Sequence, residues 1–149
     1  MIEEKPQAWI IAVSMGYGHQ RTAYPLKELS PDGRVINAND YLGINKRDKK
    51  IWESSRKFYE FISNFYHFPL IGKVAFSLFD YFQKILTFYP RRDLTKPDIV
   101  LKRIYSLIKA GWGKDLIEKL KAKNKEIGKD LPLISTFFTP PFMAEVDNY

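Results

Sequence analysis

A short run near the N-terminus combines glycines with a histidine, residue types that together could bind a phosphate and move a proton. Residues 13–23 read VSMGYGHQRTA. One residue separates Gly16 from Gly18, and His19 directly follows Gly18. Glycine adopts positive φ angles and lets the backbone come close to a ligand. The ordinary pKa of histidine is about 6.5, which makes His19 a candidate general base. If a helix starts here, its free N–H groups would suit a phosphate.

The run matches neither common nucleotide-binding motif. The dinucleotide fingerprint needs a third glycine at position 21, where this chain has Arg21, and the P-loop needs a Gly-Lys-Ser/Thr sequence that does not follow. A tight strand-to-helix turn with an exposed histidine would explain the same pattern. The local sequence leaves both interpretations open, a ligand-binding loop and a structural turn.

The segments around this run are arranged like a βαβ unit. Residues 8–14 (AWIIAVS) are apolar and rich in β-branched side chains, which predicts a strand buried on both faces. A turn over residues 15–19 leads to a helix over 20–29, and residues 34–38 (RVINA) form a second strand. Ligands of open α/β sheets bind at the carboxyl edge, so we expect His19 there. Asp40 borders the same edge, where it could contact a ligand or cap a turn.

The C-terminal part continues the alternation of helices and strands. Helices are predicted over 97–110 and 115–125, the second as a basic surface helix, and residues 131–138 (LPLISTFF) as a buried strand. No linker or repeat interrupts the chain. The predicted fold class is α/β, a Rossmann-like parallel sheet flanked by helices, in a single domain over residues 1–149.

A stretch rich in aromatic and basic residues, about 45–92, predicts helices with a membrane-facing surface. Phe58, Phe61, Ile62 and Phe65 share one helical face, and a second helix is expected before Pro90. Burial of these faces in the core is the alternative. An aromatic surface flanked by Lys and Arg is typical of an interfacial membrane helix. The candidate membrane-facing residues are Trp52, Arg56, Lys57, Phe68, Lys73, Arg91 and Arg92.

The order of these motifs resembles a known family. The pattern Gly-x-Gly-His-x-x-x-Ala, here residues 16–23, after a first strand is similar to that of the monogalactosyldiacylglycerol synthase family. The tail over residues 131–145 (LPLISTFFTPPFMAE) resembles a later strand and loop of that family. The similarity is patchy and extends from Trp9 to Tyr149.

The resemblance implies the N-terminal, acceptor-side lobe of a GT-B glycosyltransferase. Gly16 and Gly18 would then shape a loop near the donor diphosphate, His19 would be the catalytic base, and Arg21 would offset negative charge on the leaving diphosphate. Asp40 would lie on the acceptor side. The donor, a nucleotide-sugar of the UDP type, would bind to a C-terminal lobe beyond Tyr149, so this chain alone would bind no cofactor and would be inactive.

The composition limits the classes of possible binding partner but does not identify one. The formal net charge is +7, which favours polyanions such as lipid headgroups, phosphorylated substrates or nucleic acid. With no cysteine and two histidines, a metal site has little support. Neither a signal peptide nor a membrane-spanning run is visible, so we expect a cytoplasmic protein that lies peripherally on a membrane and takes a lipid acceptor. A non-catalytic lipid-docking protein and a nucleic-acid-binding module are the alternatives, although nucleic acid is not the expected partner because the aromatics follow a helical period.

Overall fold

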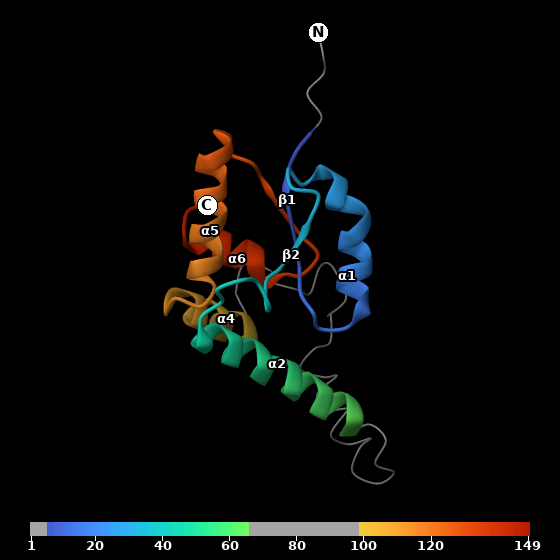
Figure 1. The fold of residues 1–149 in the computed structure, drawn as a ribbon. Coiled ribbons are helices and arrows are strands. Elements are labelled where there is room, and N and C mark those ends of the chain that lie inside the picture. The colour runs from blue at the N-terminus through green and yellow to red at the C-terminus, as the bar shows by residue number, and fades with distance from the viewer. Residues whose placement is uncertain (1–5, 66–98) are drawn as a thin grey trace, which may run out of the picture.

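Three parallel strands lie between two layers of helices in the computed structural model, which describes residues 6–65 and 99–149 (Figure 1). The strands are β1 (Trp9–Ala12), β2 (Val35–Asn37) and β3 (Leu133–Ser135). β1 pairs in parallel with both others, and Ile11 stands opposite Ile36 in β2 and Ser135 in β3. The order β2-β1-β3 confirms the predicted parallel α/β sheet.

The central strand β1 is buried along its whole length, as its apolar sequence predicts. Alternate side chains of a strand point to opposite faces. Ile10 and Ala12 pack with Ala23 in a small cluster on one face, whereas Trp9 and Ile11 join the larger core on the other. Burial on both faces requires helices on both sides of the sheet.

The strand predicted over residues 131–138 is wrong in its extent and its burial. β3 has only three residues, and the side chain of Ile134 is 36% exposed. The Oγ of Ser135 accepts a hydrogen bond from the N–H of Phe137 at 3.2 Å and donates one to the Phe137 carbonyl at 2.7 Å. These local bonds bend the chain away from β1 just after the last ladder hydrogen bond, which the N–H of Thr136 donates to the carbonyl of Ile11.

The smaller face of the sheet is covered by α1 (Tyr17–Ala23) and a 3₁₀ helix, η1 (Tyr24–Leu29). The sequence predicted one helix over 20–29, so the helix starts earlier than expected and changes type midway. Pro25 gives the reason, because it has no N–H to donate to the carbonyl four residues back and its ring crowds that carbonyl. The chain tightens to 3₁₀ geometry at this point.

The larger face is covered by helices from both halves of the chain. They are α2 (Lys46–Phe65), α4 (Ile99–Lys109), α5 (Lys114–Ile127) and α6 (Thr139–Val146). The helix predicted as a basic surface element over 115–125 is corrected by the structure, since α5 buries Leu116, Ile117 and Leu120. Its apolar stripe faces the core and its lysines face solvent, as in an ordinary amphipathic helix.

Helix α2 is held against the body of the protein by a buried tryptophan. Trp52 was predicted to face a membrane, but it is 3% exposed and its ring lies 4.8 Å from that of Trp112. That prediction is therefore wrong: the edge-to-face contact with Trp112 in the core buries the indole more fully than a surface position would allow. The other candidates Phe68, Lys73, Arg91 and Arg92, and the predicted second helix, lie outside the described residues.

The N-terminus of α2 is joined to α5 by a buried carboxylate. The Oδ1 of Asn45 accepts a hydrogen bond from the N–H of Asp48 at 2.7 Å, which caps α2. Asp48 is 2% exposed, and its Oδ2 accepts a hydrogen bond from the N–H of Gly113 at 2.9 Å. Burial raises the pKa of Asp48, and the hydrogen bonds from Gly113 and Asn45 offset only part of that effect. Asp48 therefore fixes the direction in which α2 leaves the core.

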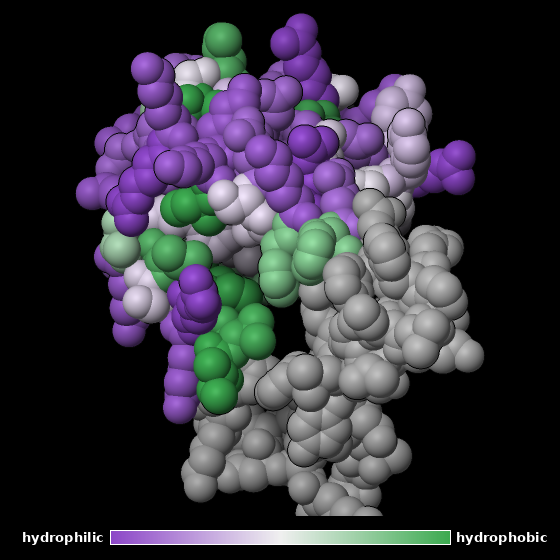
Figure 2. Space-filling model, turned by 90° about the horizontal axis from the view of Figure 1, so that it is seen from below, coloured by the Kyte–Doolittle hydropathy of each residue, from purple (hydrophilic) through white to green (hydrophobic). Residues whose placement is uncertain are grey.

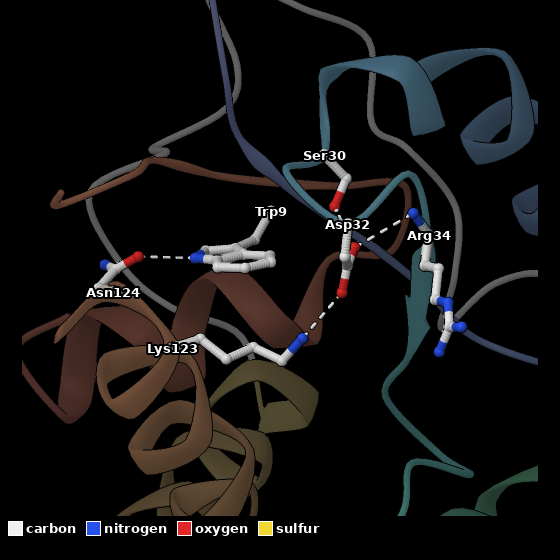
Figure 3. A network of polar contacts seen from close by, with 6 residues as sticks. All are labelled: Trp9, Ser30, Asp32, Arg34, Lys123 and Asn124. Atoms are coloured by element: carbon white, nitrogen blue, oxygen red, sulfur yellow. Dashed lines mark hydrogen bonds and ion pairs between the residues drawn. The ribbon is translucent and has the colours of Figure 1, made fainter. Parts of the chain in front are cut away.

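At the amino end of the sheet, a polar network joins the turn before β2 to α5 (Figure 3). Asp32 accepts hydrogen bonds from Ser30 Oγ at 2.8 Å and from the N–H of Arg34 at 3.2 Å, and Lys123 Nζ lies 2.8 Å from its other oxygen. Beside it, the indole N–H of Trp9 donates to Asn124 at 2.7 Å. Burial would raise the pKa of Asp32, but hydrogen bonds from Lys123, Ser30 and Arg34 outweigh it and the pKa is lowered.

Replacing Asp32 with Asn should lower the free energy of unfolding by about 0.5–1 kcal/mol at neutral pH. A carboxyl whose pKa is lower in the folded state stabilises the fold above its unfolded pKa of about 3.9, and this contribution is lost as pH falls through the folded value. The parent and the variant should therefore converge once the pH falls below the pKa of Asp32 in the folded state. Urea denaturation at neutral and acidic pH measures this. Asp40→Asn is the control, because Asp40 lies 3.8 Å from Lys49 with both side chains more than half exposed. An equal loss for D32N at both pH values would contradict the assignment.

Candidate functional site

The order of the strands reverses at β1, the central strand of the sheet. From β1 the chain passes through α1 to β2 on one side, and the later strand β3 lies on the other side of β1. The connection after β1 runs to one face of the sheet, and α6, which follows β3, packs on the opposite face (Figure 1). Such a reversal of strand order is where open α/β sheets bind ligands.

His19 lies at this reversal and bridges the ends of β1 and β3. Its Nδ1 lies 2.7 Å from the carbonyl oxygen of Thr136, and the Oγ1 of Thr136 donates to the carbonyl of His19 at 2.9 Å. The imidazole is half-buried, with the ring of Phe137 at 5.0 Å and nearly perpendicular to it. The structure therefore places His19 at the expected edge, but in a specific pair of contacts rather than exposed on a turn.

These contacts determine which ring nitrogen can act as a base. A carbonyl oxygen only accepts hydrogen bonds, so Nδ1 must carry the proton that it donates to Thr136. In the neutral ring the lone pair is then on Nε2, and within the described residues no hydrogen bond occupies that atom. A histidine that is oriented through Nδ1 and open at Nε2 is arranged as a general base.

Gly16 gives the chain its turn between β1 and α1. Its φ of 91° and ψ of 157° lie in a region that essentially only glycine occupies. A Cβ at this position would meet nothing within 4 Å, so the backbone conformation, not crowding, requires glycine. The preceding turn is held by Asn39, which accepts from the N–H of Ser14 at 2.8 Å, and by Gln20, which donates to Ser14 Oγ at 2.7 Å.

Two other residues of the motif lie elsewhere than expected. Gly18 does not shape the loop, because it is the second residue of α1 and has no positive φ. Arg21 follows His19 by two helical positions, about 200° around the axis. The structure brings His19 and Gly16 to the same edge, but it directs Arg21 away from the imidazole.

Asp40 follows β2 at the same edge and is exposed, with Lys49 of α2 at 3.8 Å. It does not contact His19 through any recorded bond, and its closest ionic partner belongs to the basic face of α2. That face carries a shallow pocket lined by Lys46, Lys49, Lys50, Glu53, Ser54 and Lys57. Arg56, at its margin, lies 3.8 Å from Glu60. Arg56 and Lys57 are exposed, and their position against a membrane stays a prediction.

Hydrophobic side chains form patches on the described part of the molecule when it is viewed from below (Figure 2). Large hydrophobic residues are exposed near the ends of the described segments of α2 and α4: Phe58 is 61% exposed, Phe61 59%, Ile99 83% and Val100 60%. Most of the remaining surface in this view is hydrophilic. Phe58 and Phe61, which belong to the predicted apolar face, are thus not buried in the core, and the side chains of Ile62 and Phe65 lie outside the described ones.

Sequence reasoning missed the residues that orient His19. Thr136 and Phe137 were placed inside a buried strand, and Ser14, Gln20 and Asn39 were given no role. Asn39 directly precedes Asp40 after a predicted strand, so its position offered a signal. For Thr136 and Phe137 no signal existed, because a separation of 117 residues from His19 to Thr136 is bridged only by the sheet.

Comparisons with protein-family models, with curated proteins and with solved structures found no match to this chain. Among residues 6–65 and 99–149, no helix is long and apolar enough to span a membrane. Within the same residues, no cluster of three or more histidine or carboxylate side chains could hold a metal ion.

Substitutions at Gly16 and Gly18 should have opposite effects on stability, because Gly16 lies in the turn and Gly18 in the helix. Gly16→Ala should lower the free energy of unfolding by about 1–3 kcal/mol, because alanine is strained in this backbone conformation. Gly18→Ala should instead raise it by about 0.5–1 kcal/mol, since alanine favours a helix and its Cβ would meet nothing within 4 Å. Thermal or urea unfolding of both variants measures the difference. A Gly16→Ala variant as stable as the parent would show that the turn does not need the observed conformation.

Proposed function

We propose that this chain is the N-terminal, acceptor-side lobe of a GT-B glycosyltransferase that transfers a hexosyl group from a nucleotide-sugar to a lipid at a membrane surface. The observation that carries the proposal is the position of His19, oriented through Nδ1 at the reversal of strand order with Nε2 open. The resemblance of residues 16–23 to the monogalactosyldiacylglycerol synthase motif supports the same role.

In this proposal His19 is the general base of the transfer. Its Nε2 takes the proton of the acceptor hydroxyl, and the hydroxyl oxygen bonds to the anomeric carbon of the sugar. The bond from that carbon to the diphosphate breaks, and the nucleoside diphosphate leaves with the electron pair. Imidazole is the side chain that most often serves as a general base in such a step. The UDP-type donor would be held by a second lobe. Arg21 points away from His19, so the described residues give it no contact to the reacting centre.

The basic face of α2 supports docking on an anionic membrane. Lys46, Lys49, Lys50 and Lys57 follow a helical spacing on one side of α2, and Trp52 is buried on the other. Each basic residue near an anionic surface contributes about 1 kcal/mol. The exposed apolar residues of α2 lie close along the same helix, as interfacial binding requires.

Replacing His19 with Asn in the natural full-length protein should lower turnover by about 10²–10⁴-fold. The Asn side-chain amide can still donate to the Thr136 carbonyl, but it offers no nitrogen base in place of Nε2. The measurement is sugar transfer from UDP-hexoses to diacylglycerol and polyprenyl-linked acceptors. Tyr17→Phe is the control, because Tyr17 lies in the same helix and is 82% exposed. Turnover of H19N within a few-fold of the parent would remove His19 from the chemistry.

Charge reversal on α2 should weaken binding to anionic vesicles. The double variant K50E/K57E should lose at least about tenfold in affinity in low-salt co-sedimentation, since each lysine contributes about 1 kcal/mol. The control K125E/R34E changes the net charge equally, at the end of α5 and the start of β2, and should bind like the parent.

Two outcomes would contradict membrane docking. Equal loss in both double variants would show that net charge rather than the α2 face attracts the vesicles. A salt-dependent shift with single-stranded oligonucleotides, without vesicle binding, would favour the nucleic-acid-binding alternative.

A further inference from the structure

The carbonyl of Thr136, which accepts the hydrogen bond from His19 Nδ1, is held in place by the sheet. The N–H of Thr136 donates to the carbonyl of Ile11 at 3.1 Å, which extends the β1–β3 ladder by one residue. On the other side, the Oγ of Ser135 ties the N–H and the carbonyl of Phe137. The peptide between Thr136 and Phe137 is therefore fixed from both ends, and its carbonyl oxygen has a defined direction.

The ring of Phe137 occupies the other side of the imidazole. Its edge-to-face contact with His19, at 5.0 Å and 88°, is the arrangement that aromatic pairs prefer. Phe137 is itself packed against Trp52 of α2 at 6.0 Å and Phe138 at 4.6 Å. These contacts on the Phe137 ring oppose a movement that would let the imidazole turn over.

Rotation of the imidazole by half a turn would break the observed arrangement. The Nδ1–H would leave the Thr136 carbonyl, and a ring C–H would take its place, which leaves a half-buried carbonyl with a poorer partner. The hydrogen bond sets the proton on Nδ1, and the Phe137 ring keeps the imidazole in the orientation that allows this bond.

We propose that Phe137 is a positioning residue of His19: together with the fixed carbonyl of Thr136, its ring holds the imidazole in the Nδ1–H tautomer with Nε2 open to a substrate. A backbone carbonyl here has the role that a carboxylate has in the Ser-His-Asp arrangement. The catalytic consequence rests on the proposed function, whereas the tautomer is a property of this chain alone.

The tautomer can be read directly by ¹⁵N NMR of the imidazole. The chain has two histidines, so the substitution His67→Gln leaves only the signals of His19. The spectrum is recorded on the alkaline plateau, where the ¹⁵N shifts no longer change with pH. We expect the ratio of the Nδ1–H to the Nε2–H tautomer to be about tenfold higher than in free histidine, which corresponds to one hydrogen bond of about 1.4 kcal/mol and makes Nδ1–H the major form. Free histidine favours the opposite tautomer, so an Nε2–H majority would overturn the proposal.

Variants at Phe137 and Phe138 form a matched pair. Phe137→Leu keeps an apolar side chain but removes the perpendicular ring, and it should reduce the Nδ1–H preference several-fold. Phe138→Leu removes the neighbouring ring, which has no recorded contact with His19, and should leave the tautomer unchanged. Thr136→Val removes the Oγ1 donor to His19 but keeps the accepting carbonyl, and should preserve the tautomer. An unchanged ratio in F137L, or equal changes in F137L and F138L, would refute the role of Phe137.

Activity separates this proposal from the function on which its consequence rests. If His19 carries its proton on Nδ1 but H19N retains turnover in the full-length protein, the positioning stands and the catalytic role fails. If F137L shifts the tautomer and also lowers kcat more than F138L does, both stand. Since the NMR measurement needs neither donor nor acceptor, its result does not depend on the transferase assay.

Discussion

The structure depends on the burial of β1 on both faces. A strand with no polar side chain from Trp9 to Ala12 cannot lie at a solvated surface, so the chain must place helices on each side of it. On one face, the side chains of Ile10 and Ala12 are covered by the two short helices α1 and η1. Trp9 and Ile11 need a thicker layer, which four helices from both halves of the chain supply. The three-layer arrangement follows from this constraint (Figure 1).

The candidate site is a consequence of the same arrangement. With β2 on one side of β1 and β3 on the other, the connections diverge to opposite faces and leave the carboxyl end of β1 without a covering crossover. Gly16 turns the chain sharply there, and His19 reaches across to Thr136. The histidine is oriented by backbone groups of the sheet, so its geometry is as rigid as the strands themselves.

The basic face of α2 and the candidate base are linked through the core. Trp52 anchors α2 from within, against Trp112 and Phe137, and Phe137 touches His19. Asp48 holds the start of the same helix at the N–H of Gly113. The helix that carries the lysines and the edge that carries the histidine therefore belong to one packed unit. In the proposed function, this packed unit would hold His19 at a fixed distance from the membrane surface on which α2 docks.

The sequence by itself determined the elements that depend on local composition: the apolar β1, the glycine turn, a parallel α/β class and a helix that carries Phe58 and Phe61. It also placed His19 at the correct edge, because strand ends and glycine turns are local signals. Only the tertiary structure decided that Trp52 is core rather than membrane-facing and that Gly18 belongs to a helix. It alone brought Thr136 and Phe137 to His19. Indole burial and contacts across 117 residues depend on which elements meet in space, and no local pattern encodes that.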